Sequence, residues 1–417
     1  MSAIVLMMLA QMGQPMQRWM PNQDNGSLAF FEFAPASGAG MGTTCACTTP
    51  TGVKGETMTF TRTGNATCSK QGLATTGIAN GDLVVCTANQ PRVESSGGVL
   101  GLRVEGAWTN STVRSQQLDN AAWSTAGSTP SAPTITADYA TAPDGTTTAE
   151  RLQFPAVTGG ENSSIFESAA CPAAAARMTI YVRGVATSGS ICLWANDTAN
   201  ATNCAFTNTG WTRCQTTTGG TAASLVLGNL GSIAGCVGAN AAQDIVAWGA
   251  QCEAGAYATS YIPTVAAAVT RGAESVEFPS VSVAGLSTAG SAAITLTPAW
   301  TGSPGGSTSS GVVGWDTAGR PLYNTVSGLR TYDGTNDVQL AASSNFVAGT
   351  PKRYYSTWAV GPGVLIRNQT DALQQTGAFD GAMAASGTLS ISTIAGANDT
   401  ARIVSSVCLD PSPTRCR

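Results

Sequence analysis

Strand-length runs separated by turn-forming clusters dominate this sequence and leave little room for helices. Residues 56–62 alternate between polar and apolar side chains with a period of two, which is typical of a half-buried β-strand. Ala142-Pro-Asp-Gly145 is a strong turn signal. Further strand-like runs lie at residues 99–105, 177–183, 191–194, 224–227, 244–248, 292–297, 354–360, 388–394 and 402–407. Short strands at this spacing predict an all-β chain of antiparallel sandwiches.

The amino-acid composition supports the same fold class. Charged residues make up 11% of the chain, less than half of the ~25% that is usual in soluble domains. Glycine, alanine, serine and threonine take their place, which suits tight turns and small-residue sheet faces better than solvated helices. Low charge also weakens the repulsion that keeps free monomers apart. We therefore expect the chain to assemble into something larger.

Two further features exclude whole classes of function. The sequence contains no histidine, so a Ser-His-Asp or Cys-His catalytic pair, a histidine-ligated metal and a histidine pH switch are all excluded. The net charge is −4, and the only lysines are Lys54, Lys70 and Lys352. Because binding to a polyanion needs clustered basic residues, nucleic acid is not expected as a partner.

The twelve cysteines are irregularly spaced and form no Cys-x-x-Cys pair, so zinc-ribbon and thioredoxin-type sites are not indicated. Cys45 and Cys47 are too close in sequence to bridge each other easily within a strand. Cys408 and Cys416 bracket a proline-containing segment and are suited to closing a small loop. Two interpretations stay open for the others, namely disulfides in a protein outside the cell and buried thiols on sheet faces.

The first ten residues are apolar, but this stretch is too short for the ~20 residues that span a bilayer. It also lacks the basic start of a signal peptide, so no membrane partner is expected. Methionine is frequent in the first twenty positions, and methionine adapts well to interfaces. We expect a docking segment here; a short core helix or strand is the alternative.

Several blocks of the sequence together resemble a module of bacteriophage and prophage tail or virion structural proteins. The blocks are Glu56–Arg62, Asn89–Arg92, Leu100–Asn110, Leu118–Trp123, Ala142–Ala149, Trp248–Gly255, Tyr257–Thr264 and Val269–Arg271. The segment from Cys408 to Cys416 is similar to an ending seen in such proteins. Cys252 stands where the family usually has leucine, a departure that leaves the strand interpretation intact.

The resemblance implies a carbohydrate-binding-module-like jelly roll followed by a concanavalin A-like, laminin G-type sandwich. On this basis we expect a docking and assembly segment at 1–54, a β-rich connecting region at 55–110, the jelly roll at 111–272 and the second sandwich at 273–417. A chain of this length exceeds one ordinary core, which agrees with several domains. Pro263 stops a strand ladder and suits a module boundary.

Candidate sites follow from the chemistry of such sandwiches. Aromatic faces stack on sugar rings, although a sandwich tryptophan more often lies in the core. Six tryptophans are available for such stacking: Trp123, Trp194, Trp211, Trp300, Trp315 and Trp358. The residues proposed for glycan contact are Trp315, Trp358 and Tyr332. No cofactor is expected. Oxygen ligands at 333–337 and at 196–198 suit calcium, but an ordinary Asx turn explains either segment equally well.

The leading hypothesis is a non-enzymatic structural protein of a phage particle, such as a fibre, spike or tail appendage. It would be assembled in the host cytoplasm, dock to other virion proteins through its N-terminus and form a homotrimer, by analogy with the family. The alternatives are an adhesin that binds host surface polysaccharide and a head fibre or capsid decoration protein. A depolymerase would need two carboxylates facing each other across a cleft, and the sequence gives no reason to pair any two of its glutamates.

Overall fold

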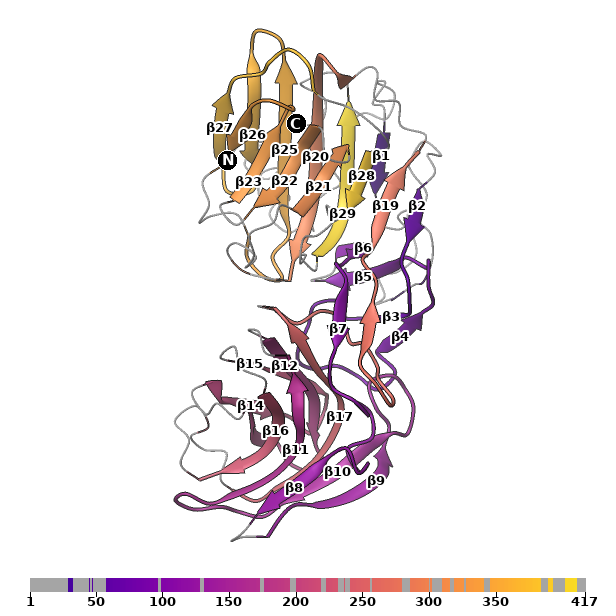
Figure 1. Cartoon of the computed structure of the whole chain (residues 1–417), viewed down its shortest axis with the longest axis vertical. Helices are drawn as coiled ribbons and strands as arrows, with labels where there is room; N and C mark the ends of the chain where they lie inside the picture. The colour runs from indigo at the N-terminus through magenta and orange to yellow at the C-terminus, as the bar shows by residue number, and fades with distance from the viewer. Residues whose placement is uncertain are drawn as a thin grey trace, which may run out of the picture.

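The computed structural model describes residues 29–32, 45, 47, 58–96, 99–127, 131–172, 176–195, 200–218, 223–231, 236, 241–255, 257–279, 286–299, 301, 310–315, 319–325, 328–340, 346–383, 389–392 and 402–410. In this part of the chain the regular secondary structure is β-strand throughout. Two sandwiches of antiparallel sheets follow each other along the long axis of the molecule (Figure 1). The predicted all-β class with tandem antiparallel sandwiches is thus confirmed. Within the described residues, no helix has the length and apolar character needed to cross a membrane.

The middle sandwich is made of two five-stranded sheets. The β12 sheet contains, in spatial order, β15 (Thr212–Thr217), β12 (Ala176–Gly184), β17 (Gln243–Ala254), β10 (Ala149–Phe154) and β9 (Thr134–Ala140). The β13 sheet contains β14 (Thr202–Phe206), β13 (Gly189–Trp194), β16 (Ala223–Leu230), β11 (Asn162–Cys171) and β8 (Ser124–Gly127). Counted along the chain, β10 to β17 enter the two sheets in the order of an eight-stranded jelly roll, and β8 and β9 extend the edges.

Period-two patterning explains how the middle sandwich closes. In β12, Met178, Ile180 and Val182 point into the space between the sheets and are fully buried. Each such side chain contributes roughly 1.5–3 kcal/mol through burial. The residues between them lie on the opposite face of the β12 sheet, away from this core. That outer face therefore has to be covered by another part of the chain or left open to a ligand.

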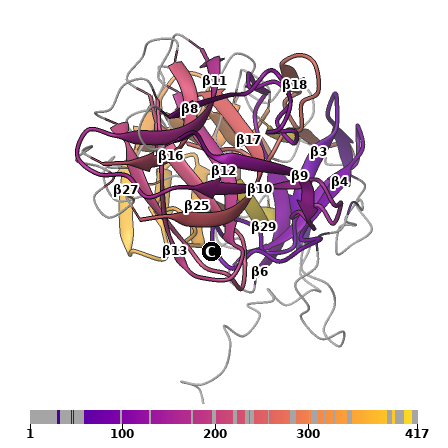
Figure 2. The same cartoon turned by 90° about the horizontal axis from the view of Figure 1, so that it is seen from below.

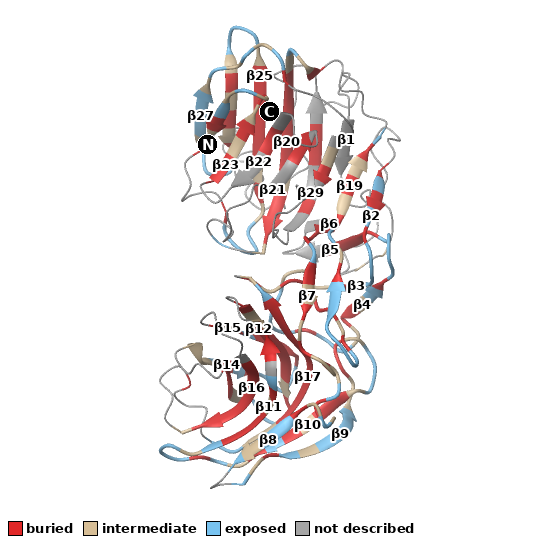
Figure 3. Cartoon of the chain, viewed as in Figure 1, coloured by how far each residue is buried: buried red, intermediate tan, exposed pale blue. Residues whose placement is uncertain are grey.

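The C-terminal sandwich is formed by two larger sheets. The β25 sheet contains β27 (Leu373–Gly377), β26 (Gly363–Asn368), β25 (Lys352–Ala359), β20 (Ala289–Pro298), β29 (Arg402–Asp410), β6 (Val99–Val104) and β5 (Arg92–Ser96), with β1 (Ala29–Glu32) also paired to β29. The β22 sheet contains β2 (Thr59–Thr61), β19 (Ser275–Phe278), β28 (Leu389–Ser392), β21 (Ser310–Trp315), β22 (Gly319–Thr325), β23 (Gly328–Tyr332) and β24 (Asp337–Gln339). Their facing sides enclose one hydrophobic core, seen as buried strands in Figure 3.

Strands from the predicted connecting region belong to this C-terminal sandwich. β2 pairs with β19, and β6 pairs with β29, so residues near 60 and 100 complete sheets whose other strands begin near residue 275. The middle sandwich is therefore inserted between two parts of the chain that fold together. Most of the predicted docking segment lies outside the described residues. The division of the chain into separate domains stays a prediction.

Two small antiparallel pairs lie between the sandwiches: β3 (Ala66–Ser69) with β4 (Leu83–Cys86), and β7 (Trp108–Asn110) with β18 (Val269–Arg271). The start of β4 is joined to the turn between β9 and β10, because the backbone N–H of Leu83 donates to the carbonyl of Pro143 at 2.8 Å; Figure 2 shows these strands from below. Ile78 and Leu83 from the hairpin pack with Trp211, Trp248 and Tyr261 into a second core on the outer face of the β12 sheet. The hairpin therefore covers one end of that face.

The described cysteines are all in disulfides, so the interpretation as buried thiols is wrong for them. The bridges are Cys45–Cys68, Cys47–Cys86, Cys171–Cys252, Cys192–Cys236 and Cys204–Cys214, and Cys408 is bridged as well. Cys416, the second cysteine of the predicted Cys408–Cys416 loop, lies outside the described residues. Cys252 of β17 links the two sheets of the middle sandwich through its disulfide with Cys171 of β11.

Candidate functional site

A buried ion network lies where the chain passes between the two sandwiches. This junction network consists of Arg62, Arg92, Arg103, Arg271, Glu94, Glu105 and Glu274, all with side chains at most 4% exposed. Its members come from the ends of β2, β5, β6 and β18 and from the segment before β19. The network therefore connects strands of the C-terminal sandwich with the two-stranded pair that leads into the middle sandwich.

Glu105 and Glu274 accept most of the hydrogen bonds in the junction network. Arg92 donates from Nε and Nη2 to the two carboxylate oxygens of Glu274, at 2.9 and 2.6 Å. Arg103 donates from Nε and Nη2 to Oε1 of Glu105, at 3.0 and 2.6 Å. Arg271 lies 2.6 Å from Oε2 of the same glutamate. Such two-pronged pairs are the strongest geometry available to arginine and carboxylate.

The arginines keep Glu105 ionised in spite of its burial. Burial by itself raises the pKa of Glu105, but the attraction of Arg103, Arg271 and Arg92 outweighs it and holds the pKa well below its usual range. Ser260, in the segment between β17 and β18, donates to the same carboxylate through its Oγ at 2.6 Å. The network therefore ties the two sandwiches together through buried ion pairs.

Most members of the network belong to the sequence blocks that carry the family resemblance. Arg62, Arg92, Glu105 and Arg271 end or lie within four separate blocks, and the structure brings them into one cluster. Glu274 lies just past the last of these blocks. The sequence signal for this network was that charged residues continue the apolar face of a strand at its end. Nothing in the local sequence indicated which of these charged residues would pair.

A cavity of about 480 Å³ lies next to this network. One wall is the part of the outer β12-sheet face that the hairpin leaves uncovered, with Arg177, Tyr181, Arg213 and Gln215. A second wall comes from the hairpin, between residues 67 and 83, and from Glu94 and Arg103 of the junction network. Loop residues near 299–301 and 348–349 of the C-terminal sandwich complete it. All three parts of the fold thus contribute to one cavity, whose volume lies in the ~300–1,000 Å³ range of ligand pockets.

Arg213 of the β12-sheet wall is held in place by neutral oxygen atoms. Arg213 donates from Nη1 to the backbone oxygen of Thr259 at 2.7 Å and from Nη2 to Oγ1 of Thr179 at 3.1 Å. Its guanidinium carbon lies 5.5 Å from the ring centre of Tyr181, in cation–π geometry. Burial lowers the pKa of Arg177 from its ordinary value. The wall is preorganised and carries positive charge.

Sequence reasoning missed Arg177 and Arg213 as site residues. The alternation of residues 177–183 was recognised as a strand, and it puts Arg177, Thr179 and Tyr181 on the face opposite the core. A sheet face that combines arginine, tyrosine and threonine was the available signal. Whether such a face forms a binding site depends on which other segments of the chain cover it.

The three residues predicted for glycan contact are not brought together around this cavity. Trp358 is fully buried in the core of the C-terminal sandwich, and its Nε1 donates to the backbone oxygen of Leu286 at 2.8 Å. A fully buried ring cannot stack on a sugar, so the prediction for Trp358 is wrong. Tyr332 is half-buried and donates its hydroxyl to the Gly334 carbonyl at 2.6 Å. The side chain of Trp315 lies outside the described residues.

The other tryptophans considered follow the same pattern where they are described. Trp123, Trp194 and Trp211 are 6%, 7% and 0% exposed, so each belongs to a core. Trp300 lies outside the described residues. These described tryptophan rings are therefore not exposed for stacking on a sugar.

The candidate calcium segment at 333–337 is an Asx turn. Oδ1 of Asp333 accepts hydrogen bonds from the backbone N–H groups of Thr335 and Asn336, at 2.8 and 2.5 Å. Its Oδ2 accepts from the side-chain amide of Asn336 and from the backbone of Asp380. The carboxylate is thus occupied by local donors. Residues 196–198 lie outside the described residues.

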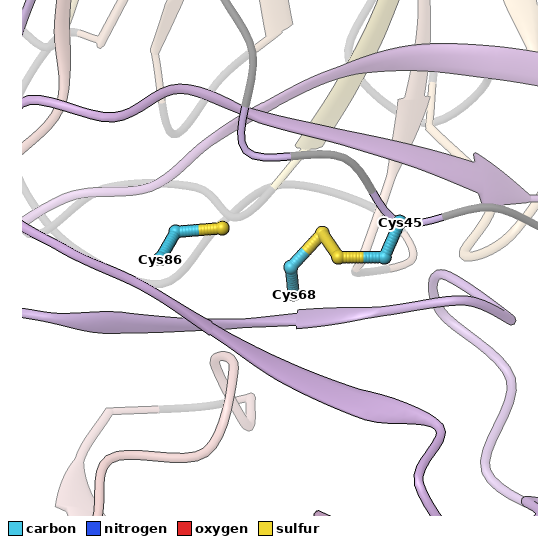
Figure 4. A group of neighbouring side chains, drawn as sticks. All are labelled: Cys45, Cys68 and Cys86. Carbon is cyan, nitrogen blue, oxygen red and sulfur yellow. A yellow bond between two sulfur atoms is a disulfide. The ribbon is translucent and has the colours of Figure 1, made fainter.

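Three cysteine sulfur atoms form a cluster beside the β3–β4 hairpin. The Sγ atoms of Cys45, Cys68 and Cys86 lie within 4.8 Å of one another (Figure 4). Cys45 is bonded to Cys68, and Cys86 is bonded to Cys47. Because a metal ligand must be a free thiolate, this oxidised cluster acts as a double staple between the segment near residue 45 and the hairpin.

Comparisons with known proteins give little further information. No protein-family model matches the chain, and no curated protein matches it. Among solved structures, the chain is similar to the Trypanosoma rangeli sialidase in complex with sialic acid, with 10% sequence identity and a TM-score of 0.24. The match covers 79% of this chain and 61% of the sialidase chain. A likeness at this level carries no argument about fold or function.

Proposed function

We propose that the chain is a non-catalytic structural and attachment protein of a phage particle, which holds a host-surface glycan in the cavity between its two sandwiches. The observation that carries the proposal is the cavity of about 480 Å³, lined by arginine, tyrosine, glutamine and threonine side chains. Groups of this kind orient sugar hydroxyls, and the half-buried side chain of Leu73 supplies apolar contact area. The phage assignment rests on the family resemblance of the sequence blocks.

The joint between the sandwiches supports a mechanical role. The junction network joins them through buried ion pairs, and the paired β7 and β18 carry both connections between them. An appendage must transmit force between its anchored end and its binding end without folding back on itself. A joint made of solvent-excluded ion pairs favours one relative orientation of the sandwiches.

The disulfides support exposure of the protein outside the cell. For five bridges the structure describes both cysteines, and these bridges lie at the hairpin and in the middle sandwich. Disulfides persist on virion and cell surfaces and are rare in reducing cytosol. For a particle assembled in the host cytoplasm, this implies that the bridges form during or after release.

The charge pattern of the cavity supports binding rather than hydrolysis. Within the described lining, Glu94 is the one carboxylate, and it pairs with Arg103 at 3.0 Å. Glu105 and Glu274 lie together nearby but are fully buried and bound to arginines. Glycoside hydrolysis needs two carboxylates ~5–9.5 Å apart across the sugar.

Immunogold electron microscopy tests the particle assignment. Antibodies raised against the purified chain should label a defined position on particles of the phage or prophage that encodes it. Absence of the chain from purified particles, with the chain present in the lysate, would contradict the assignment. Light scattering on the full chain and on a chain lacking residues 1–28, which keeps Cys45 and Cys47, tests the homotrimer and the role of the N-terminus in it.

Polysaccharide extracted from the host surface tests the attachment role. The purified chain should bind this polysaccharide and block adsorption of the phage, and Tyr181→Ala in the cavity wall should weaken both effects. Binding that survives this substitution unchanged would place the glycan elsewhere on the molecule.

A further inference from the structure

We propose that four cysteines beside the β3–β4 hairpin bind one zinc ion when their two disulfides are reduced. This cysteine cluster consists of Cys45, Cys47, Cys68 and Cys86. In the oxidised chain these residues form two neighbouring bridges, and in the reduced chain they present four sulfur ligands to one point. The inference does not depend on the proposed function, because it concerns the chemistry of these cysteines in any reducing compartment.

The sulfur atoms of the cysteine cluster already lie close to one another. The Sγ atoms of Cys45, Cys68 and Cys86 are all within 4.8 Å of each other (Figure 4), and Cys47 is bonded to Cys86, so the fourth sulfur adjoins the same group. A tetrahedral zinc site with Zn–S bonds of ~2.3 Å holds its sulfur atoms roughly 3.8 Å apart. Short side-chain movements therefore convert the cluster into a tetrathiolate site.

The two cysteines of the hairpin share one face for a reason that is independent of their disulfides. Cys86 lies opposite Ala66 in the register of β3 and β4, and Cys68 follows Ala66 by two residues. Directly opposed residues share a face of a sheet, and so do residues two apart on one strand. Cys68 and Cys86 are thus diagonal neighbours, and both are fully buried. With its bridges open, the hairpin still presents two sulfur ligands side by side.

Hydrogen bonds from the junction network hold the backbone at these two cysteines. Arg62 donates from Nη2 to the backbone oxygens of Cys86 and Thr87, at 3.1 and 2.7 Å. Arg92 donates from Nη1 to the backbone oxygen of Thr67 at 2.8 Å. Reduction breaks sulfur–sulfur bonds and does not act on these contacts. Half of the proposed ligand set is therefore preorganised without the disulfides.

Cys45 and Cys47 supply the other half of the ligand set. They are separated by one residue, so in an extended segment both side chains point to the same side. This spacing does not suit a bridge between the two, but it allows both thiols to reach one ion that lies against the hairpin. Cys45 is bonded to Cys68 of β3 and Cys47 to Cys86 of β4, so this segment already faces both hairpin cysteines.

The adjacency of the two bridges favours a metal site over simple stapling. Two disulfides hold two segments together wherever they lie, whereas metal ligands have to converge on one point. Within the part of the chain that the structure describes, the cysteine cluster is the only group of three or more cysteine or carboxylate side chains whose ligand atoms converge in this way. The described bridges of the middle sandwich connect separate pairs.

The metal would stabilise the hairpin where disulfides do not persist. A two-stranded hairpin is only marginally stable by itself in water, and disulfides are rare in reducing cytosol. Binding of Zn²⁺ displaces the four thiol protons. On oxidation, the four thiolates pass four electrons to two molecules of a small disulfide, which take up four protons and become four thiols. Two bridges form in the chain and the zinc ion is released.

Cobalt titration of the reduced full chain tests the inference. The chain is reduced with a phosphine, which is then removed, and Co²⁺ is added in the absence of air. The expected result is uptake of one cobalt ion per chain with the absorption spectrum of tetrahedral tetrathiolate cobalt, followed by its replacement when Zn²⁺ is added. A reduced chain that is folded by circular dichroism and gives no such spectrum overturns the inference. A reduced chain that stays unfolded with zinc present overturns it as well.

Serine variants of the two half-buried cysteines locate the site. Cys45→Ser and Cys47→Ser should each abolish the tetrathiolate spectrum and weaken cobalt binding by more than the ~10-fold that loss of even an outer-shell partner costs. Cys204→Ser is the matched control, because Cys204 pairs with Cys214 in the middle sandwich. Zinc should raise the unfolding temperature of the reduced control but not of the reduced Cys47→Ser chain. A tetrathiolate spectrum that survives in both cluster variants, or is lost in the control, overturns the assignment to these cysteines.

Discussion

Arg92 and Glu274 are separated by 182 positions in the sequence, yet the guanidinium of one donates to both carboxylate oxygens of the other, at 2.9 and 2.6 Å. Both side chains are fully buried. Arg92 begins β5 and Glu274 immediately precedes β19, so the pair joins the two sheets of the C-terminal sandwich at the end that faces the middle sandwich. The whole middle sandwich is inserted in the chain between them. This contact joins the two parts of the chain between which the middle sandwich is inserted.

Glu274→Gln should destabilise the protein severely. The substitution removes the carboxylate that pairs with Arg62 and leaves Arg92 with Glu105 as its remaining carboxylate partner. Breaking a buried ion pair in this way costs about 3–5 kcal/mol. Denaturant unfolding measures the loss. Asp244→Asn is the control, because its partner Arg151 is partly exposed and a solvent-screened pair of this kind contributes little to stability. Similar losses for the two variants would contradict the structural role of the junction network.

Stability should fall as pH rises from about 4.5 to about 8. Burial raises the pKa of Glu150 to about 8, so the folded chain holds a proton there that the unfolded chain has already lost. The folded state thus binds more protons in this window, and the free energy of unfolding decreases with pH. Glu167 acts in the same direction, because burial raises its pKa to about 7.

Glu150→Gln should flatten this pH dependence, since glutamine stays neutral throughout. Thermal unfolding between pH 4.5 and 8 compares it with the unchanged chain and with Asp380→Asn, which alters an exposed carboxylate in the other sandwich. An unchanged slope for Glu150→Gln would mean that this carboxyl is not buried in solution.

Removal of the Cys171–Cys252 bridge should cost more than removal of Cys204–Cys214. The two bridges close loops of 81 and 10 residues, and the longer loop removes more entropy from the unfolded chain. The chain-entropy relation gives about 4–5 kcal/mol for the first and about 3 kcal/mol for the second. Paired alanine variants, unfolded in denaturant without reductant, test the order. The reverse order would indicate that native packing around the shorter bridge matters more than loop length.

Gly255→Ala should destabilise the joint between the sandwiches. Gly255 has a φ of +133°, a conformation that L side chains rarely adopt, and an added Cβ would lie 2.2 Å from the Trp108 ring. Overpacking and backbone strain of this kind cost about 1–3 kcal/mol each. Gly160→Ala, where an added Cβ meets nothing within 4 Å, is the control and should change stability by less than about 0.5 kcal/mol.

Local features of the sequence were sufficient for the fold class. Alternation at residues 56–62 and 177–183 predicted strands that the structure contains as β2 and β12. Such a prediction needs only local sequence, because successive side chains of a strand point to opposite faces of the sheet. The scarcity of charge and of helix-forming runs agreed with these signals.

Pairing across long distances was decided by the tertiary structure. No sequence pattern showed that Arg92 would meet Glu274, because the partner of each residue depends on how the two sheets pack against each other. Trp358 illustrates the same limit: a strand pattern cannot tell which face a second sheet will cover, and that face turned out to be the core.

The sequence alone therefore determined the β-strands, the turns and the absence of histidine chemistry, all of which depend on residue type and local spacing. The disulfide partners, the junction network and the cavity were decided only in three dimensions. Arg177 and Arg213 line that cavity together with residues of the hairpin and of the C-terminal sandwich. The physical reason is that burial and charge pairing depend on which distant segments exclude water from a side chain, and no local pattern contains that information.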